Sequence, residues 1–130
     1  MKKILAITAL LISLLASTCF AADWYWLVST DTASFYVDRN SGNWKGSVLN
    51  CTEKLIFTNG DYAIMDSSYN YDEYPRIFRR QNYCWAYNAD GSLQESAPNY
   101  VWELVPPESN GELVSIKIYQ LFEGNRHRQH

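Results

Sequence analysis

The stretch 48-VLNCTEKLIFTNGDYAIMDSSYNY-71 decides the fold. Apolar and polar side chains alternate along residues 48–57, and the run at 62–71 returns with the same period, which is typical of strands. Asn59 and Gly60 separate the two runs, and both tolerate positive φ, so they form a strong hairpin signal. The stretch therefore predicts two antiparallel strands joined by a tight turn.

The period of two continues on both sides of this hairpin. Residues 23–29 and 33–38 predict a second hairpin around a turn at 30–32. The stretch 39–46 is rich in Asn, Ser and Gly and predicts a loop, and Pro75 breaks the chain. A turn at 88–91 ends a later strand. We expect five or six antiparallel strands, at residues 23–29, 33–38, 48–57, 62–71 and 77–87, with a short extended run at 100–105.

The chain changes character after Pro106 and Pro107. Ser109 and Glu112 fit a capping box, in which the Ser accepts a bond from a first-turn N–H and the Glu reaches back. One helical face then carries Val114, Ile118, Leu121 and Phe122, and residues 124–125 provide a stop signal. The β-branched Val114, Ile116 and Ile118 would equally suit a strand. We expect an α+β fold, an antiparallel sheet with one C-terminal helix packed on it.

The N-terminus predicts export. Lys2 and Lys3 precede an apolar run at 4–15, and small residues follow, which is the pattern of a secretory signal peptide. Cleavage after Ala21 leaves a single domain of residues 22–130, in the periplasm, at the cell surface or secreted. The apolar run is about a dozen residues, shorter than the roughly 20 of a spanning helix, so no transmembrane anchor is expected. An uncleaved anchor and a lipid on Cys19 are the alternatives.

Charge argues against nucleic acid as a partner. The whole chain has 11 basic and 14 acidic residues, and loss of Lys2 and Lys3 with the signal peptide makes the balance more acidic. Proteins that bind nucleic acid carry dense basic surfaces instead. The two basic clusters here, Arg76 to Arg80 and Arg126 to His130, are typical of a solvated face and a chain terminus.

Two cysteines remain after the predicted cleavage, in a compartment where disulfides persist. We predict that Cys51 and Cys84 form a disulfide. The alternative is that the two thiols stay separate. Bridged cysteines need Cα atoms within about 7 Å, whereas strands once removed in a sheet lie about 9.6 Å apart, so a plain meander would keep Cys51 and Cys84 apart. No His lies near either thiol in sequence, so no metal site is expected.

Two groups of residues resemble a known family. The opening has Trp26 to Val28, a turn from Ser29 to Thr32, and Phe35 to Asp38, and it is similar to the "W-x-x-V-x-S-D" and "aromatic-Y-[IV]-D" hairpin of the bacterial surface-adhesin protein E-like domains. The ending is similar to their "Y-D-x-D-G" turn and "W-x-x-[IV]-x-P-x-S-x-[GE]-E" helix entry, through Asn88 to Gly91, Trp102, Val105, Pro106, Ser109, Gly111 and Glu112.

The resemblance implies a sheet of about six strands with the helix on its concave face, and surface or periplasmic residence without catalytic activity. Some members of that family are lipid-anchored and bind host extracellular-matrix proteins. This sequence departs from the family pattern in three places. It has no convincing lipobox, its helix has no cysteine, and Gly42 stands where an apolar residue is usual.

The residues needed for catalysis are sparse. The two histidines, His127 and His130, lie in the terminal run, so a Ser-His-Asp or Cys-His arrangement has no positioned base. A small secreted hydrolase remains the minor alternative, with a carboxylate pair drawn from Asp66, Asp72, Glu73 or Glu103. We therefore expect a noncatalytic protein without a cofactor.

A cluster of tyrosine and arginine surrounds Pro75, and both residue types are enriched at binding hot spots. We predict that this cluster binds a protein of the envelope or of a host, although a half-exposed sheet face stiffened by cross-strand tyrosines is the simpler explanation. Its members are Tyr69, Tyr71, Tyr74, Arg76, Arg79 and Arg80. The alternative function is an envelope-associated carbohydrate-binding module with exposed, coplanar rings. An open sheet edge would also favour a homodimer.

Overall fold

The computed structural model describes residues 22–126, which form an open antiparallel sheet of eight strands and one helix. The predicted signal peptide, Cys19, His127 and His130 lie outside the described residues. The elements are β1 (Trp24–Ser29), β2 (Ala33–Asp38), β3 (Asn43–Lys45), β4 (Val48–Phe57), β5 (Tyr62–Asn70), β6 (Phe78–Tyr87), β7 (Leu93–Pro98), β8 (Trp102–Leu104) and α2 (Asn110–Arg126).

The sheet is a meander in the order β1-β2-β4-β5-β6-β7. Strand β3 adds to one end of β4, and β8 pairs with the start of β6, in line with β7. The predicted α+β class is confirmed, but the sheet has more strands than the five or six expected. Strand β3 lies in the stretch predicted as a loop, and it forms because Trp44 is buried opposite Leu49. Strand β7 is exposed on both faces and so has no alternation to detect.

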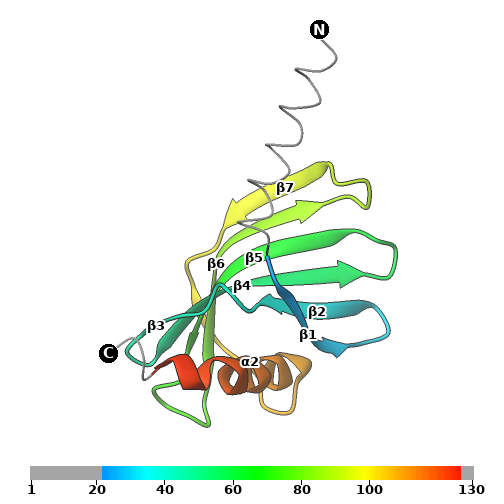
Figure 1. The fold of residues 1–130 in the computed structure, drawn as a ribbon. Coiled ribbons are helices and arrows are strands. Elements are labelled where there is room, and N and C mark those ends of the chain that lie inside the picture. The colour runs from blue at the N-terminus through cyan, green and yellow to red at the C-terminus, as the bar shows by residue number, and fades with distance from the viewer. Residues whose placement is uncertain (1–21, 127–130) are drawn as a thin grey trace, which may run out of the picture.

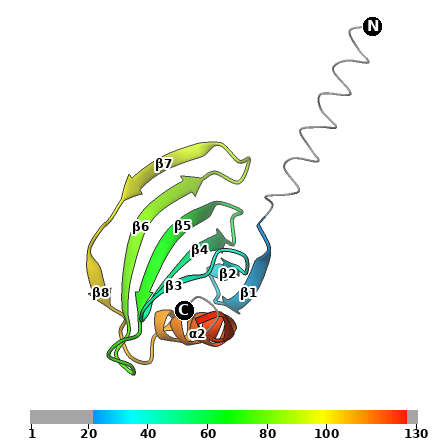
Figure 2. The same ribbon diagram turned by 60° about the vertical axis from the view of Figure 1, so that its left-hand side comes forward.

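The sheet is strongly curved, and helix α2 lies on its concave side, near β1 and β3 (Figure 1). Figure 2 shows that the helix covers the end of the concave face formed by the first strands and that β7 lies at the far end of the arc. The curved sheet therefore has a covered part and an open part.

Helix α2 begins at the predicted cap. The Glu112 N–H donates to Ser109 Oγ at 3.1 Å, as expected, but the Glu112 carboxylate accepts from the Glu108 N–H at 3.3 Å, one residue earlier than a capping box requires. The predicted stop at 124–125 is wrong, because the helix continues to Arg126. Gly124 has open space around it, and a glycine inside a helix costs only about 1 kcal/mol relative to alanine.

The core lies between α2 and the first strands. Val114, Ile118 and Phe122 of the helix are buried against Leu27, Val37 and Leu49, and each such side chain contributes about 1.5–3 kcal/mol. Hydrogen bonds also tether the helix to the sheet. Trp44 Nε1 donates to the Phe122 carbonyl at 2.9 Å, the Tyr71 hydroxyl to the Ser115 carbonyl at 2.8 Å, and Lys117 Nζ to the Leu27 carbonyl at 2.7 Å.

Gly42 allows the chain before β3 to approach the helix closely. A Cβ atom added at Gly42 would lie 2.3 Å from Cδ1 of Phe122, well inside van der Waals contact. An apolar side chain at this position would therefore displace the Phe122 ring.

The predicted disulfide is not formed. Cys51 and Cys84 are free, on β4 and β6, with β5 between them. Cys51 lies opposite Ser67 and Cys84 opposite Met65. The two thiols thus occupy strands once removed, the geometry that prevents bridging. Burial, assisted by the Glu53 carboxylate, raises the pKa of the Cys51 thiol well above its usual value.

Candidate functional site

The structure separates the six predicted binding residues into three places. Tyr69 and Tyr71 are buried, with exposures of 1% and 5%, because alternate residues of one strand share a face and this face is concave. Arg79 and Arg80 are neighbours on β6, so they point to opposite faces. The six residues therefore do not form the single patch that the sequence predicted.

Two of the six are exposed together at the turn between β5 and β6. Tyr74 is 59% exposed. Arg76 forms an exposed ion pair with Glu73 at 3.5 Å. Tyr74 also lines a cavity of about 320 Å³ with Tyr71 and Tyr119, next to the helix. On the convex face, Arg80 lies over the Trp102 ring, 4.8 Å from its centroid.

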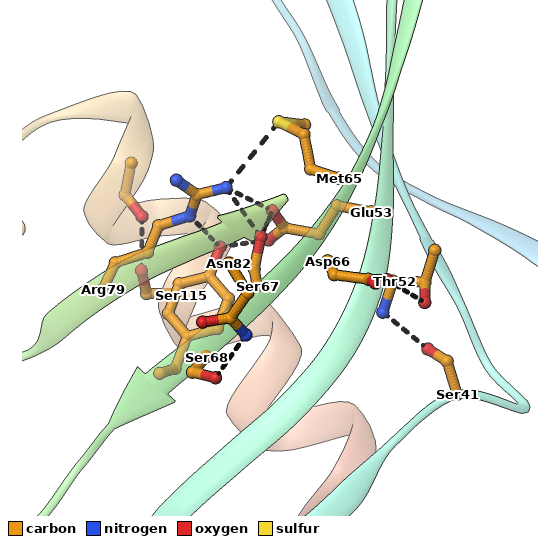
Figure 3. Close-up of polar contacts among 12 residues, drawn as sticks. Ser41, Thr52, Glu53, Met65, Asp66, Ser67, Ser68, Arg79, Asn82 and Ser115 are labelled. Atoms are coloured by element: carbon orange, nitrogen blue, oxygen red, sulfur yellow. Dashed lines mark hydrogen bonds and ion pairs between the residues drawn. The ribbon is translucent and has the colours of Figure 1, made fainter. Parts of the chain in front are cut away.

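The most organised polar group lies on the concave face, where β4, β5 and β6 place Glu53, Ser67, Tyr69 and Arg79 side by side. Figure 3 shows Arg79 directed toward Glu53 and Ser67. Arg79 Nη2 donates to Glu53 Oε2 and to Ser67 Oγ, each at 2.8 Å. Arg79 Nε donates to the Tyr69 hydroxyl at 3.1 Å. The Tyr69 and Ser67 hydroxyls in turn donate to the Glu53 carboxylate. We call these four residues the Glu53–Arg79 network.

The electrostatics of this network hold Arg79 in its charged form. Burial alone would lower the pKa of the Arg79 guanidinium, but the Glu53 carboxylate and the Tyr69 hydroxyl raise it above its usual value. Burial and the Glu53 carboxylate also raise the pKa of Tyr69 well above 10.0. The Tyr69 phenol therefore stays protonated, which suits a hydrogen-bond donor and not a general base.

Sequence analysis missed Glu53, although a signal was present. Glu53 follows Leu49 and Cys51 on the apolar face of an alternating strand, and a lone acidic residue on a buried face requires a partner. Arg79, the partner of Glu53, is harder to predict, because β6 has an extra residue, Asn82, between the pairs Asp66–Tyr83 and Ser67–Gln81. This bulge changes which side chains of β6 face the concave side.

A second candidate surface is the outer edge of the sheet, which we call the β7–β8 edge. Both strands pair with β6, and no described strand pairs with their other side. Exposed apolar residues concentrate here, with Leu93 at 54%, Tyr100 at 68%, Val101 at 59%, Trp102 at 37% and Leu104 at 44%. Edge strands that expose apolar side chains are binding or aggregation sites.

Residues 22–126 have no group of three or more His, Cys, Asp or Glu side chains placed to hold a metal ion. None of the helices in this part of the chain is long and apolar enough to cross a membrane. Comparison with family models, with curated proteins and with solved structures found no match to this chain.

Proposed function

We propose that this chain is an exported, noncatalytic binding protein, similar to the surface-adhesin protein E-like domains, that binds a protein of the envelope or of a host. The observation that carries the proposal is the β7–β8 edge, where exposed apolar residues run from Leu93 to Leu104 beside unpaired backbone groups. An extended segment of a partner can add a strand to such an edge, and its side chains can contact the exposed rings.

The charge of the edge indicates what the partner segment contains. Glu95 and Glu103 are exposed, and neither has an ion pair among the described residues. A partner segment with apolar residues and a lysine or arginine would complement them. A second copy of this chain would bring its own Glu95 and Glu103 to the same edge, which favours a different partner over the predicted homodimer.

The carbohydrate alternative has less support, because it requires ring faces open to solvent. Tyr62 and Tyr87 stack on each other, with centroids 4.9 Å apart and planes 17° from parallel. Lys117 lies over the Trp26 ring, and Arg80 lies over the Trp102 ring. One face of each of these rings already has a neighbour, so a protein partner fits the surface better than a sugar.

A matched pair of substitutions tests the proposal. Leu104 on the edge and Leu113 on the helix are similarly exposed, at 44% and 41%, so Leu104→Lys and Leu113→Lys add the same charge to different surfaces. Binding of purified extracellular-matrix proteins and of an envelope protein fraction to the immobilised protein is then measured. We expect Leu104→Lys to weaken binding at least about tenfold, as for a hot-spot residue, and Leu113→Lys to leave it unchanged.

Two results would contradict the proposal. Equal binding by Leu104→Lys and the parent protein would exclude the edge as the binding surface. Sedimentation that shows a dimer in the parent and a monomer in Leu104→Lys would identify a second copy as the occupant.

A further inference from the structure

Two cavities adjoin on the concave face beside the Glu53–Arg79 network. Each has a volume of about 250 Å³. Both are lined by Arg79, Val105 and Gly111, so they adjoin at these three residues. The remaining walls of the first are mainly apolar, formed by Phe35, Leu55, Met65, Tyr69 and Val114. The second adds polar groups, among them Gln81 and Glu103.

Arg79 has one donor group that the network does not use. Its Nε and Nη2 atoms donate to Tyr69, Glu53 and Ser67, whereas Nη1 has no hydrogen-bond partner among residues 22–126 (Figure 3). No buried side-chain nitrogen or oxygen in this part of the chain lacks a partner, so Nη1 must be accessible to solvent. The 28% exposure of the Arg79 side chain agrees with this. Nη1 is therefore available to an acceptor in the cavities.

The surrounding charges indicate which acceptor fits. Glu53 already balances the charge of Arg79, and Glu103, which lies opposite Arg79 on β8, lines the second cavity. The sum of these three charges is negative. Lys54 also lines the first cavity, but its ammonium group lies over the Trp24 and Tyr62 rings, which are not part of the lining, so an anionic ligand is disfavoured. A neutral carbonyl oxygen can accept from Nη1 without this repulsion.

We propose that the two cavities form one groove that binds a small, uncharged, apolar molecule with a carbonyl group. The carbonyl oxygen accepts a hydrogen bond from Arg79 Nη1, and the apolar part packs against Leu55, Met65 and Val114. Val101, Glu103 and Leu104 of the β7–β8 edge also line the second cavity, but this inference differs from the proposed function because it concerns the concave face and a different class of ligand.

Hexanamide is the test ligand, and the ¹³C-labelled methyl group of Met65 reports binding by NMR. Met65 lines the first cavity, and its resonance is assigned as the one lost in Met65→Leu. We expect a saturable shift with hexanamide. Hexanoate has the same chain with a negative charge, and it should bind at least about fivefold more weakly.

Three variants locate the site. Gly111→Leu places a side chain beside Val105, because a Cβ at Gly111 would lie 3.5 Å from Val105 Cγ1 in ordinary contact, and it should abolish the shift. Gly124→Leu, on the same helix but with no neighbour within 4 Å, should bind as the parent does. Arg79→Lys keeps a charge for Glu53 but loses Nη1, and it should weaken hexanamide binding about fivefold to tenfold, the effect of one hydrogen bond.

Several outcomes would overturn the proposal. They are binding of hexanoate as tight as that of hexanamide, undiminished binding by Gly111→Leu, and undiminished binding by a folded Arg79→Lys. If Arg79→Lys does not fold, the pair Gly111→Leu and Gly124→Leu still decides whether the groove is the site. Gly111→Leu leaves the residues of the β7–β8 edge unchanged, so failure here is distinguishable from failure of the proposed function.

Discussion

The two ends of the sheet differ in what covers them. Strands β1 to β4 carry the buried residues that pack against α2, among them Leu27, Val37 and Leu49, whereas every residue of β7 and β8 is exposed. Both ends contain large apolar side chains. The covered end uses them to hold the helix, and the open end leaves them accessible. The covered end therefore stabilises the fold, the proposed binding edge lies at the open end, and the Glu53–Arg79 network lies between them.

The largest effect is expected from breaking that network. Glu53→Ala leaves the Arg79 cation partly buried without its partner, and we expect a loss of about 3 kcal/mol in the free energy of unfolding. Asp23→Ala is the control, because its ion pair with Arg39 is 44–50% exposed, and should cost less than about 1 kcal/mol. Urea denaturation measures both, and similar losses would mean that the network does not stabilise the sheet.

The next effect concerns the covered end. Gly42→Ala places a Cβ against the Phe122 ring, and the shift needed should cost about 1–3 kcal/mol. Gly124→Ala meets no neighbour, and it should stabilise the helix by about 0.5–1 kcal/mol. The two substitutions should shift the urea midpoint in opposite directions. A neutral Gly42→Ala would show that the helix packs less tightly on the sheet than described.

The covered end should also be sensitive to alkali. Burial raises the pKa of Tyr69 and Tyr71 above 10.0 and that of Cys51 above 9.0. The unfolded chain loses these protons at a pH where the folded protein keeps them, so stability is complete below about pH 9 and falls as pH rises. Each group contributes about 1.4 kcal/mol per pH unit above its unfolded pKa. Tyr71→Phe should reduce the slope above pH 10 by about that amount, and an unchanged slope would refute this assignment.

The smallest effect is expected at the open end. Leu104→Ser removes an exposed apolar side chain from the β7–β8 edge, and we expect a change in stability within about 0.5 kcal/mol. Thermal unfolding followed by circular dichroism measures it. A loss comparable with that of Gly42→Ala would show that the edge belongs to the core, and the contrast between the two ends would fail.

The sequence predicts those strands that bury one face and expose the other. Strand β4 has the predicted bounds of residues 48–57, because its alternation reflects one face toward the core. Strand β3 could not be predicted in this way, because three residues are too few to show a period. The strand forms because Trp44 is buried against the helix, at a contact with Phe122 far along the chain. Strand β7 has no buried face, so no period marks it.

The site was only partly predictable. The sequence predicts Tyr69 and Arg79 as binding residues of one surface patch, whereas the structure places both in the Glu53–Arg79 network. Their burial depends on Glu53, which lies 26 residues before Arg79 in the chain, and on the bulge at Asn82, which changes the face of β6. Local patterns do not report pairings across strands, so the network could not be assembled from the sequence.

The strand order has a consequence for folding kinetics. Neighbours in the main path of the sheet are nearly always neighbours in the chain, so its hairpins can nucleate locally with little loop-closure entropy. Helix α2 differs, because its tethers to Trp44 and Leu27 span 78 and 90 residues. We therefore expect helix docking to follow sheet formation. Until it docks, the apolar face under α2 is open to water, and this interval is when the nascent domain is most vulnerable to aggregation and most accessible to chaperones.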